Sequence, residues 1–468
     1  MSPKKPFSPT RRRALQGLGA AALAGGAACE PTDEAPRTDG TLEEAIDTVV
    51  FLMMENRTFD HYFGAYSLVE GRADVDGLTE DMSNPTRDGT PVFVHPADRD
   101  CIPDPPHGWA DTHTQWGDGA NDGFVREHED RHGPDEAHRV MGFWDREMLP
   151  ASYALADEYA LCQRWFCSVL SSTWPNRFYS LMASSFGEHG NDPPDFGGAP
   201  SIFDRLHDAG IPYGGYFGNV GFAGLVPDAR ANGTFEEMDF FWGHAERGIL
   251  PPVTVIDPIF GRNDDHPPAH PLAGQVLINS VYRALAASPQ WERMLLVITY
   301  DEHGGFFDHV PPPETADPYA EFTRMGFRVP TVVAGPYVKQ MVSDTVYDHT
   351  SWLAFLERRF GLEPLNERDA AANDLTDLLD WDRIAALDPR PPLDLPVIEA
   401  DDDVLYRPEC SSIGGGGRDL APVTGQPELE AYLDALPERP DWDQRHRTDA
   451  IYEQFLRRAE ALGALKRR

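Results

Sequence analysis

The sequence predicts an α/β fold built on a mostly parallel β-sheet that is covered by helices. Two unbroken apolar runs, residues 49–54 and 295–299, are too short to cross a membrane and are typical of strands buried on both faces. Between these runs, residues 201–256 alternate as helix 202–209, strand 213–217, helix 238–246 and strand 253–256. That β/α rhythm favours a parallel or mixed doubly wound sheet.

Residues 1–28 are predicted to direct export and to take no part in the fold. They carry five basic residues and no acid, followed by an Ala/Gly/Leu-rich run over 14–28, which is the pattern of a signal peptide. Residues 10–15 resemble a twin-arginine signal, which implies export after folding. Cys29 follows Gly26 and two alanines as in a lipoprotein box, although leucine is usual at the Gly26 position, so lipidation of Cys29 stays open. We expect a periplasmic, secreted or lipid-anchored protein at the cell envelope.

The composition excludes some partners. The formal net charge is −37 over 468 residues, and it becomes about −42 once the signal is removed. Such a surface is repelled by nucleic acid and by anionic lipid, so we expect no nucleic-acid partner and membrane contact only through lipidation at Cys29. The four remaining cysteines contain no CxxC pair and suggest no zinc site, and their pairing cannot be assigned: Cys101, Cys162, Cys167 and Cys410.

The chain is expected to contain one large domain. Residues 29–45 are polar and rich in Pro, Asp and Glu, as in a linker. The predicted domain covers 46–365, with a long surface insertion over 65–150 that is partly helical around 137–147. An acidic extension, 366–468, ends in an amphipathic helix over 448–466 and is expected to pack on the domain.

Polar residues follow both buried runs directly. Glu55 and Asn56 end the first run, and Asp301 and Glu302 end the second. If the strands are parallel, these four side chains meet at one edge of the sheet, where ligands bind in α/β proteins. Carboxylate and amide oxygens suit a divalent cation. The alternative for Asn56 is the N-cap of a helix that begins near residue 57.

A hydroxyl-rich turn precedes Pro175. We expect a helix over 152–160, a strand over 162–170, and then the turn Ser171-Ser172-Thr173 before Pro175 and a helix over 178–185. A hydroxyl between a strand and a helix lies where backbone N–H groups favour an anion, and a metal can make it a nucleophile. Alternatively, Ser172 or Thr173 simply caps the helix.

Three histidines occupy candidate loop positions. His107 lies in a Pro- and Gly-rich loop, and Asp265 with His266 form a turn before a helix over 274–287, either as ligands and proton donors or as an Asx turn. After a strand over 329–334, His349 opens a helix over 351–360 and either caps it or takes part in catalysis.

A family resemblance rests on four motifs that follow one another in the chain: VVFLMMENRTFDHYFG at 49–64, STWPNRFY at 172–179, DDHPP at 264–268 and ITYDEHGGFFDHVPPP at 298–313. In this order they resemble the bacterial phosphoesterase family that contains phospholipases C and acid phosphatases of the A type. The match runs from about residue 48 to 360. The resemblance implies an α/β/α sandwich of the alkaline-phosphatase-like kind and makes 46–365 the catalytic domain.

The resemblance also implies site residues. The metal-binding positions of the family match Glu55, Asn56, Asp301 and Glu302, with Thr173 as nucleophile and metal neighbour. The polar positions around the phosphate match His107, Asp265, His266 and His309. The cofactor is then a divalent metal ion whose identity the sequence does not give. Ser171-Ser172 departs from the Gly-Pro pair that is frequent before the nucleophile.

The resemblance implies hydrolysis of phosphate esters through a phosphothreonine on Thr173, with a small phosphoester or a phospholipid as substrate. The long C-terminal β modules of larger phospholipases C are absent from this sequence. Two specificities stay open, monoester hydrolysis and phosphodiester cleavage. A different class, a non-catalytic surface lipoprotein that binds phosphorylated ligands, is disfavoured because Thr173 and all four oxygen donors are present.

The export signal can be tested directly. Changing Arg11 and Arg12 together to Lys is expected to retain the precursor in the cytoplasm, because the twin arginines are the recognised feature. Cell fractionation with an antibody against the mature chain measures this. Unaffected export would reject the twin-arginine interpretation, and a Cys29→Ser variant with unchanged detergent partitioning would reject lipidation.

Overall fold

The computed structural model describes residues 40–407, 410 and 444–468, which belong to one compact unit extending from residue 39 to the C-terminus. The predicted signal peptide, Cys29 and most of the predicted linker lie outside the described residues. The last residues of that linker form a short capped helix, α1 (Leu42–Ala45), whose Thr41 side chain accepts a hydrogen bond from the Glu44 N–H. No helix in the described part of the chain combines the length and the apolar character that a membrane span requires.

An eight-stranded sheet forms the centre of the fold, in the order β12-β6-β11-β10-β1-β9-β7-β8. All neighbouring strands pair in parallel except β11, which runs against both β10 and β6. The mostly parallel sheet is therefore confirmed. Its strands are β1 (Thr48–Met54), β6 (Ala160–Cys162), β7 (Tyr213–Phe217), β8 (Thr234–Glu237), β9 (Val253–Asp257), β10 (Met294–Tyr300), β11 (Val332–Ala334) and β12 (Met341–Ser343).

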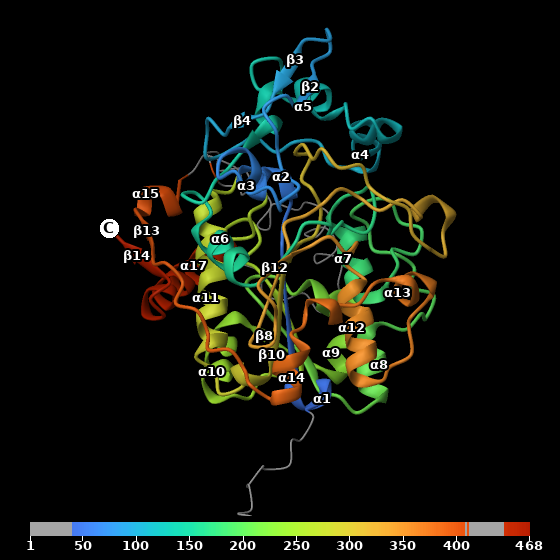
Figure 1. The fold of residues 1–468 in the computed structure, drawn as a ribbon, viewed down its shortest axis with the longest axis vertical. Coiled ribbons are helices and arrows are strands. Elements are labelled where there is room, and N and C mark those ends of the chain that lie inside the picture. The colour runs from blue at the N-terminus through green and yellow to red at the C-terminus, as the bar shows by residue number, and fades with distance from the viewer. Residues whose placement is uncertain (1–39, 408–409, 411–443) are drawn as a thin grey trace, which may run out of the picture. The chain divides into compact units, whose positions relative to one another are not determined.

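Helices cover both faces of the sheet, which confirms the predicted α/β/α sandwich. One layer contains α6, α10, α11 and α17, and the other contains α7, α8, α12 and α13 (Figure 1). The helices of the two layers, with α9 and α14, are α6 (Pro150–Glu158), α7 (Thr173–Met182), α8 (Ile202–Asp208), α9 (Ala229–Asn232), α10 (Met238–Arg247), α11 (Pro271–Ala286), α12 (Ser351–Phe360), α13 (Glu367–Ala371), α14 (Trp381–Ala386) and α17 (Gln444–Ala461).

The two central strands are buried along their whole length. Every residue of β1 and β10 is buried, as expected for strands between two helical layers. The ring of Phe51 on β1 stacks on Trp352 of α12, with centroids 4.4 Å apart. The apolar runs at 49–54 and 295–299 are therefore strands because both of their faces meet helices, and the polar residues that follow them begin where this cover ends.

One predicted strand is largely wrong. The expected strand over 162–170 is reduced to β6, which ends at Cys162, and the chain beyond it makes only isolated bridges at Trp165 and Phe166. Arg328 donates from Nη1 to the Gln163 carbonyl, so a buried cation takes an acceptor that a strand neighbour would otherwise use. The irregular stretch leads directly into α7, which begins at Thr173.

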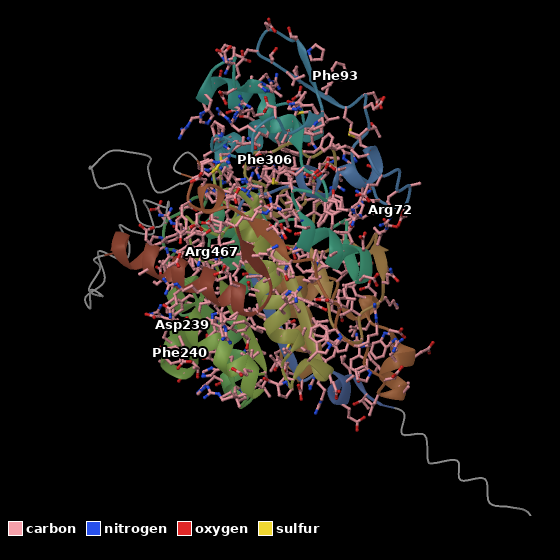
Figure 2. All side chains as sticks on the ribbon, turned by 90° about the vertical axis from the view of Figure 1, so that its left-hand side faces the viewer. Arg72, Phe93, Asp239, Phe240, Phe306 and Arg467 are labelled. Atoms are coloured by element: carbon pink, nitrogen blue, oxygen red, sulfur yellow. A yellow bond between two sulfur atoms is a disulfide. The ribbon has the colours of Figure 1, made fainter. Side chains whose placement is uncertain are left out.

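The insertion over 65–150 forms a separate apolar cluster at one end of the sheet (Figure 1). A helix around 137–147 was expected, but the structure has a 3-10 turn over Ala137–Met141 followed by β5. Phe93, half exposed, lies at its outer end (Figure 2). Its elements, with α2 before it, are α2 (Phe59–Phe63), α3 (Ala65–Leu68), β2 (Ser83–Pro85), β3 (Pro91–Phe93), β4 (His95–Pro96), α4 (Trp109–Trp116), α5 (Phe124–His132) and β5 (Gly142–Phe143).

The C-terminal extension packs on the α11 side of the sheet. Strand β13 (Ile398–Ala400) pairs in parallel with β14 (Leu465–Arg467), and α15 (Asp402–Leu405) follows β13. The last helix was expected over 448–466, but α17 ends at Ala461, and Gly463 has φ +70°, which turns the chain into β14. A disulfide joins Cys101 to Cys410, whereas Cys162 and Cys167 are free and buried.

Candidate active site

The carboxyl ends of β1 and β10 bring four oxygen donors together. The two strands are parallel neighbours in register, with Met54 opposite Tyr300, so the next residues of each strand leave the sheet side by side. Glu55, Asn56, Asp301 and Glu302 are all fully buried. The predicted meeting of these donors at one sheet edge is therefore confirmed as geometry.

Backbone hydrogen bonds hold the two strand ends in place. Asp301 Oδ1 accepts from the Asn56 N–H at 3.0 Å and from the Glu302 N–H at 2.7 Å. Asn56 has φ +62°, a left-handed conformation that costs about 1 kcal/mol or more for a residue other than glycine. Asn56 Oδ1 and Glu302 Oε1 are buried and have no hydrogen-bond partner among the described residues. Buried acceptors without donors are atoms that a bound cation would satisfy.

Two glycines allow the loops to approach this closely. Gly304 and Gly305 both have positive φ, +63° and +73°. A Cβ on Gly304 would lie 2.2 Å from the Asn56 carbonyl oxygen, and one on Gly305 would lie 2.5 Å from the Pro106 carbonyl oxygen. The Gly-Gly pair therefore lets the His107 loop close over the strand ends.

The site holds more negative than positive charge. Burial raises the pKa of Glu55 well above its usual range, and the neighbouring carboxylates of Asp264 and Asp301 add to this rise. Burial likewise raises the pKa of Asp301 to about 6, although Arg177 opposes it. Glu302 behaves differently: burial raises its pKa, but the positive charge of His107 and a hydrogen bond from His303 outweigh burial and lower it. A bound cation would relieve the repulsion between these acids.

Arg177 connects the acids to the helix that carries Thr173. It is buried on α7 and donates from Nε to Asp301 Oδ2 at 3.0 Å, from Nη1 to Asp257 Oδ1 at 3.2 Å and from Nη2 to the Met54 carbonyl at 3.1 Å. Thr173 lies four residues earlier, on the same face of α7. Sequence reasoning missed Arg177, although an Arg in an otherwise buried helix next to predicted acids is the signal that could have found it.

The two serines before Thr173 are engaged elsewhere. Ser171 Oγ donates to the His189 carbonyl, and Ser172 Oγ donates to Asn191 Oδ1 at 3.0 Å. The same Asn191 oxygen accepts from the Trp174 N–H at 2.9 Å. Thr173 begins α7 and is almost fully buried.

His107 reaches the site from the insertion. Its Nδ1–H donates to the Pro105 carbonyl at 2.7 Å, while Nε2 lies 3.3 Å from the Asn56 amide nitrogen and 3.7 Å from Glu302 Oε1. Burial lowers the pKa of His107, but the charges of Glu302 and Asp104 outweigh burial and raise it to about 9. The ring of His266 lies 5.8 Å away. The structure therefore brings both predicted histidines together beside the acids.

Asp265 occupies a different position from its neighbour Asp264. The Asp265 carboxylate accepts hydrogen bonds from the hydroxyls of Tyr62 and Tyr300 at 2.7 and 2.6 Å, and burial raises its pKa to about 6. Asp264, which sequence reasoning did not single out, approaches Glu55: its carbonyl accepts from the Glu55 N–H at 2.8 Å. Asp265 has φ +76°, which turns adjacent acids toward different partners.

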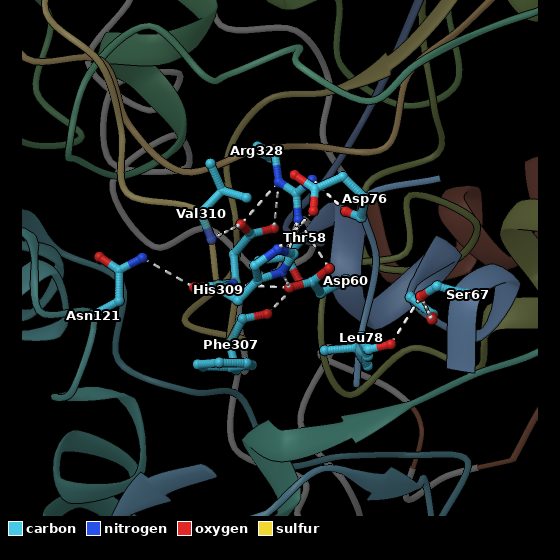
Figure 3. A network of polar contacts seen from close by, with 12 residues as sticks. Thr58, Asp60, Ser67, Asp76, Leu78, Asn121, Phe307, His309, Val310 and Arg328 are labelled. Atoms are coloured by element: carbon cyan, nitrogen blue, oxygen red, sulfur yellow. Dashed lines mark hydrogen bonds and ion pairs between the residues drawn. The ribbon is translucent and has the colours of Figure 1, made fainter. Parts of the chain in front are cut away.

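His309 lies in a separate ionic network (Figure 3). Its Nδ1–H donates to Asp60 Oδ2 at 2.7 Å and its Nε2–H to Asp76 Oδ1 at 3.2 Å. Buried Arg328 pairs with Asp60 and Asp308 at 2.9 Å each. Burial lowers the pKa of His309, but Asp60 outweighs it and raises the pKa to about 10. The contacts of His309 are therefore with this network and not with the four oxygen donors.

Two further histidines contact Asp301 and Glu302. His349 is neutral, since burial lowers its pKa to about 4, and its Nε2–H donates to the Asp301 carbonyl at 2.6 Å. His303 lies between Glu302 Oε2, at 3.2 Å, and the Gln115 side chain, at 2.7 Å. Both are positioned to orient the acids, as partners of metal ligands commonly do.

Comparison with known proteins places the chain among phosphoric ester hydrolases. The family model "Phosphoesterase family" matches residues 46–363, and the chain belongs to this family. Non-specific phospholipase C1 of Arabidopsis thaliana is 34% identical over 380 residues, which cover 71% of this chain and 70% of that protein. Phospholipase C A of Mycobacterium tuberculosis is 32% identical over 407 residues, which cover 71% and 76% of the two chains.

Similar solved structures are more distant. The phosphonate monoester hydrolase of Agrobacterium radiobacter has a TM-score of 0.37 at 11% identity and covers 71% of this chain and 77% of its own. A putative sulfatase from Bacteroides thetaiotaomicron has a TM-score of 0.36 at 13% identity and covers 51% and 70%. At these TM-scores the two structures support no inference about the site.

The close approach of Gly304 to the Asn56 backbone can be tested by substitution. Gly304→Ala places a methyl group against the Asn56 backbone in a left-handed conformation, so we expect a loss of about 3 kcal/mol or more in the free energy of unfolding. Gly361→Ala is the control, because its φ is also positive, +67°, but no atom lies within 4 Å of the added Cβ. That variant should lose about 1 kcal/mol. Urea unfolding measures both, and equal losses would contradict the close approach.

Proposed function

We propose that the chain hydrolyses phosphoesters through a phosphothreonine on Thr173, with a divalent cation held by Glu55, Asn56, Asp301 and Glu302. The observation that carries this proposal is Arg177, which connects the acids at the strand ends to the face of α7 on which Thr173 lies. Two buried acceptors without donors, Asn56 Oδ1 and Glu302 Oε1, support the cation. A divalent cation there would lower the pKa of the threonine hydroxyl and offset phosphoryl charge.

The hydroxyls of the turn favour Thr173 over its neighbours. The hydroxyls of Ser171 and Ser172 donate hydrogen bonds to the His189 carbonyl and to Asn191, so neither is oriented toward the acids. Thr173 opens α7, where the helix dipole favours the negative charge of a phosphoryl group. Asn176 holds this turn, because its side-chain amide donates to the carbonyls of Ser171 and Ser172 at 3.0 and 3.1 Å.

The reaction we propose has two displacements. The Thr173 alkoxide attacks phosphorus, the bond to the leaving alcohol breaks, and protonated His107 gives its Nε2 proton to the departing oxygen. Water then attacks the phosphothreonine and loses a proton to neutral His107, and Thr173 leaves as the alkoxide. His107 suits this step because its Nδ1–H is held by the Pro105 carbonyl while its Nε2 faces the strand-end acids. Asp265 and His266 line the phosphate position. Tyr62 and Tyr300 orient Asp265 through their hydroxyls.

We propose a phospholipid phosphodiester as the substrate. The two named relatives are phospholipases C, and each shares about a third of its aligned residues with this chain. Since the chain is strongly acidic, zwitterionic lipids suit it better than anionic ones. Comparing p-nitrophenyl phosphorylcholine with p-nitrophenyl phosphate tests this: faster cleavage of the diester supports the phospholipase interpretation, and faster cleavage of the monoester favours a phosphatase.

Removal of the cation tests metal dependence. Asp301→Asn is expected to lose the bound cation and the activity together, because Asp301 also holds Asn56 and Arg177. Asp104→Asn is the control for cation content and should keep the cation, since Asp104 belongs with His107 and His266 to a different group that could hold a metal. Elemental analysis and activity are measured on both. Because Glu55 and Asp301 have raised pKa values, protons compete with the cation, so its affinity should fall as the pH drops below about 6. Full activity in the metal-free enzyme would reject the proposal.

Substitution of Thr173 tests the nucleophile. Thr173→Ala should fold and lose several orders of magnitude in kcat, because removing a covalent nucleophile does so, whereas Thr173→Ser should retain activity. Ser172→Ala is the matched control and should lose only about 1 kcal/mol of stability, for the hydrogen bond from its hydroxyl to Asn191. Steady-state kinetics and mass spectrometry of trapped phosphoenzyme measure this. A phosphoryl group found on Ser172, or an active Thr173→Ala enzyme, would overturn the assignment.

A further inference from the structure

The C-terminal extension is covalently joined to the loop that carries His107. Cys101 forms a disulfide with Cys410 across 309 residues, with Cα atoms 5.0 Å apart. The family model ends at residue 363, so Cys410 lies outside the part of the chain that matches the family. We call residues 398–407 with Cys410 the C-terminal strap.

The strap is held by contacts with β14 and α17. Its first strand, β13, pairs with β14, and the Tyr452 hydroxyl of α17 donates to the Leu405 carbonyl at 3.3 Å. Helix α17 in turn forms an ion pair with the loop before His266, through Asp449 and Arg262 at 2.5 Å. The strap also lines a small cavity of about 20 Å³ together with Gly261, His270 and Ala273. The strap therefore packs against the loop of the second candidate histidine.

Asp100 joins the strap to both histidine loops. It directly precedes Cys101, and its Oδ2 lies 3.1 Å from Arg407 Nη1 of the strap and 3.4 Å from His270 Nε2. His270 lies four residues after His266. Its Nδ1 accepts a hydrogen bond from the Leu272 N–H at the start of α11. One carboxylate thus connects the strap, the His107 loop and the His266 loop.

The segment between Cys101 and His107 is stiff. Three of its five residues are prolines, Pro103, Pro105 and Pro106, each of which fixes its own φ. Two carbonyls of the segment accept hydrogen bonds from the insertion, Asp104 O from His132 and Pro106 O from Gln115, both at 2.7 Å. The segment is therefore held near His107 by these hydrogen bonds and at its other end by the Cys101–Cys410 disulfide, and its stiffness transmits a displacement of Cys101 to His107.

We propose that the strap is a positioning element and that the Cys101–Cys410 disulfide, with Asp100, sets the spacing of His107 and His266. Their rings lie 5.8 Å apart. The enzyme then reaches full activity only when the disulfide is closed, as in an oxidising compartment. This inference rests on the proposed function, because His107 is the proton donor of that reaction.

Reduction of the full-length enzyme tests the inference. Tris(2-carboxyethyl)phosphine reduces the disulfide to two thiols, and the phosphine becomes its oxide with the oxygen of one water, whose two hydrogens remain on the sulfurs. We expect kcat for p-nitrophenyl phosphorylcholine to fall ten- to a hundredfold, as a misplaced catalytic group causes. KM should change less than twofold, the bound cation should remain, and reoxidation should restore the rate.

Variants separate positioning from folding. Cys101→Ser with Cys410→Ser should have the low kcat of the reduced enzyme and be insensitive to the phosphine, since Cys162 and Cys167 are free thiols. Asp100→Asn keeps the disulfide and should lower kcat by a smaller factor. Arg383→Gln, which removes exposed ion pairs to Asp380 and Asp388 elsewhere in the extension, is the control and should leave kcat unchanged.

Two results would overturn the inference. One is an unchanged kcat on reduction and in the double serine variant. The other is a loss of activity that follows the loss of folded protein, by circular dichroism, in every variant including Asp100→Asn. If Thr173→Ala stays active, the proposed function fails whatever the disulfide does. If Thr173 is essential and reduction changes nothing, only the strap inference fails.

Discussion

The carboxylate of Asp301 is the interaction on which the candidate site depends. One oxygen accepts from the backbone of Asn56 and of Glu302, which fixes the ends of β1 and β10 to each other. The other accepts from Arg177, which fixes α7 and therefore Thr173. The backbone carbonyl of Asp301 accepts a hydrogen bond from His349. Charge-assisted hydrogen bonds of this kind are strong in a buried setting, so one side chain sets the relative positions of β1, β10 and α7.

Two of the described buried arginines show why this edge differs from other parts of the core. Arg328 lies between Asp60 and Asp308, and Arg368 lies between Asp317 and Asp348, so each of these acid pairs has a buried guanidinium of its own. Such pairing is what a buried charge requires. The strand-end acids, with Asp264, share Arg177 with Asp257 and have His107 as a further positive neighbour. The remaining negative charge is the physical reason to expect a cation there.

The sequence predicted the sheet edge at which the polar residues meet, but not the residues that hold this edge in place. Apolar runs that stop at acids predicted β1, β10 and the meeting of their polar ends, because parallel neighbours end at the same edge. Arg177 was missed since periodicity does not show that a charged side chain in a buried helix has partners from distant strands. Asp264 and Asp265 could not be told apart, because the positive φ of Asp265 decides which of them approaches Glu55. The Cys101–Cys410 pairing depends on contacts across 309 residues, which spacing alone does not reveal.

The position of the cation distinguishes the strand ends from the other places where the chain could hold a metal. The part of the chain that the structure describes contains two other groups that could hold a metal, Asp104 with His107 and His266, and Asp60 with Asp308 and His309. A crystal of the enzyme soaked in Mn²⁺ and measured at the manganese edge gives an anomalous peak that locates the ion. We expect a peak about 2.0–2.5 Å from Asn56 Oδ1 and from a Glu302 carboxylate oxygen. A peak at either of the other groups, with none at the ends of β1 and β10, would contradict it.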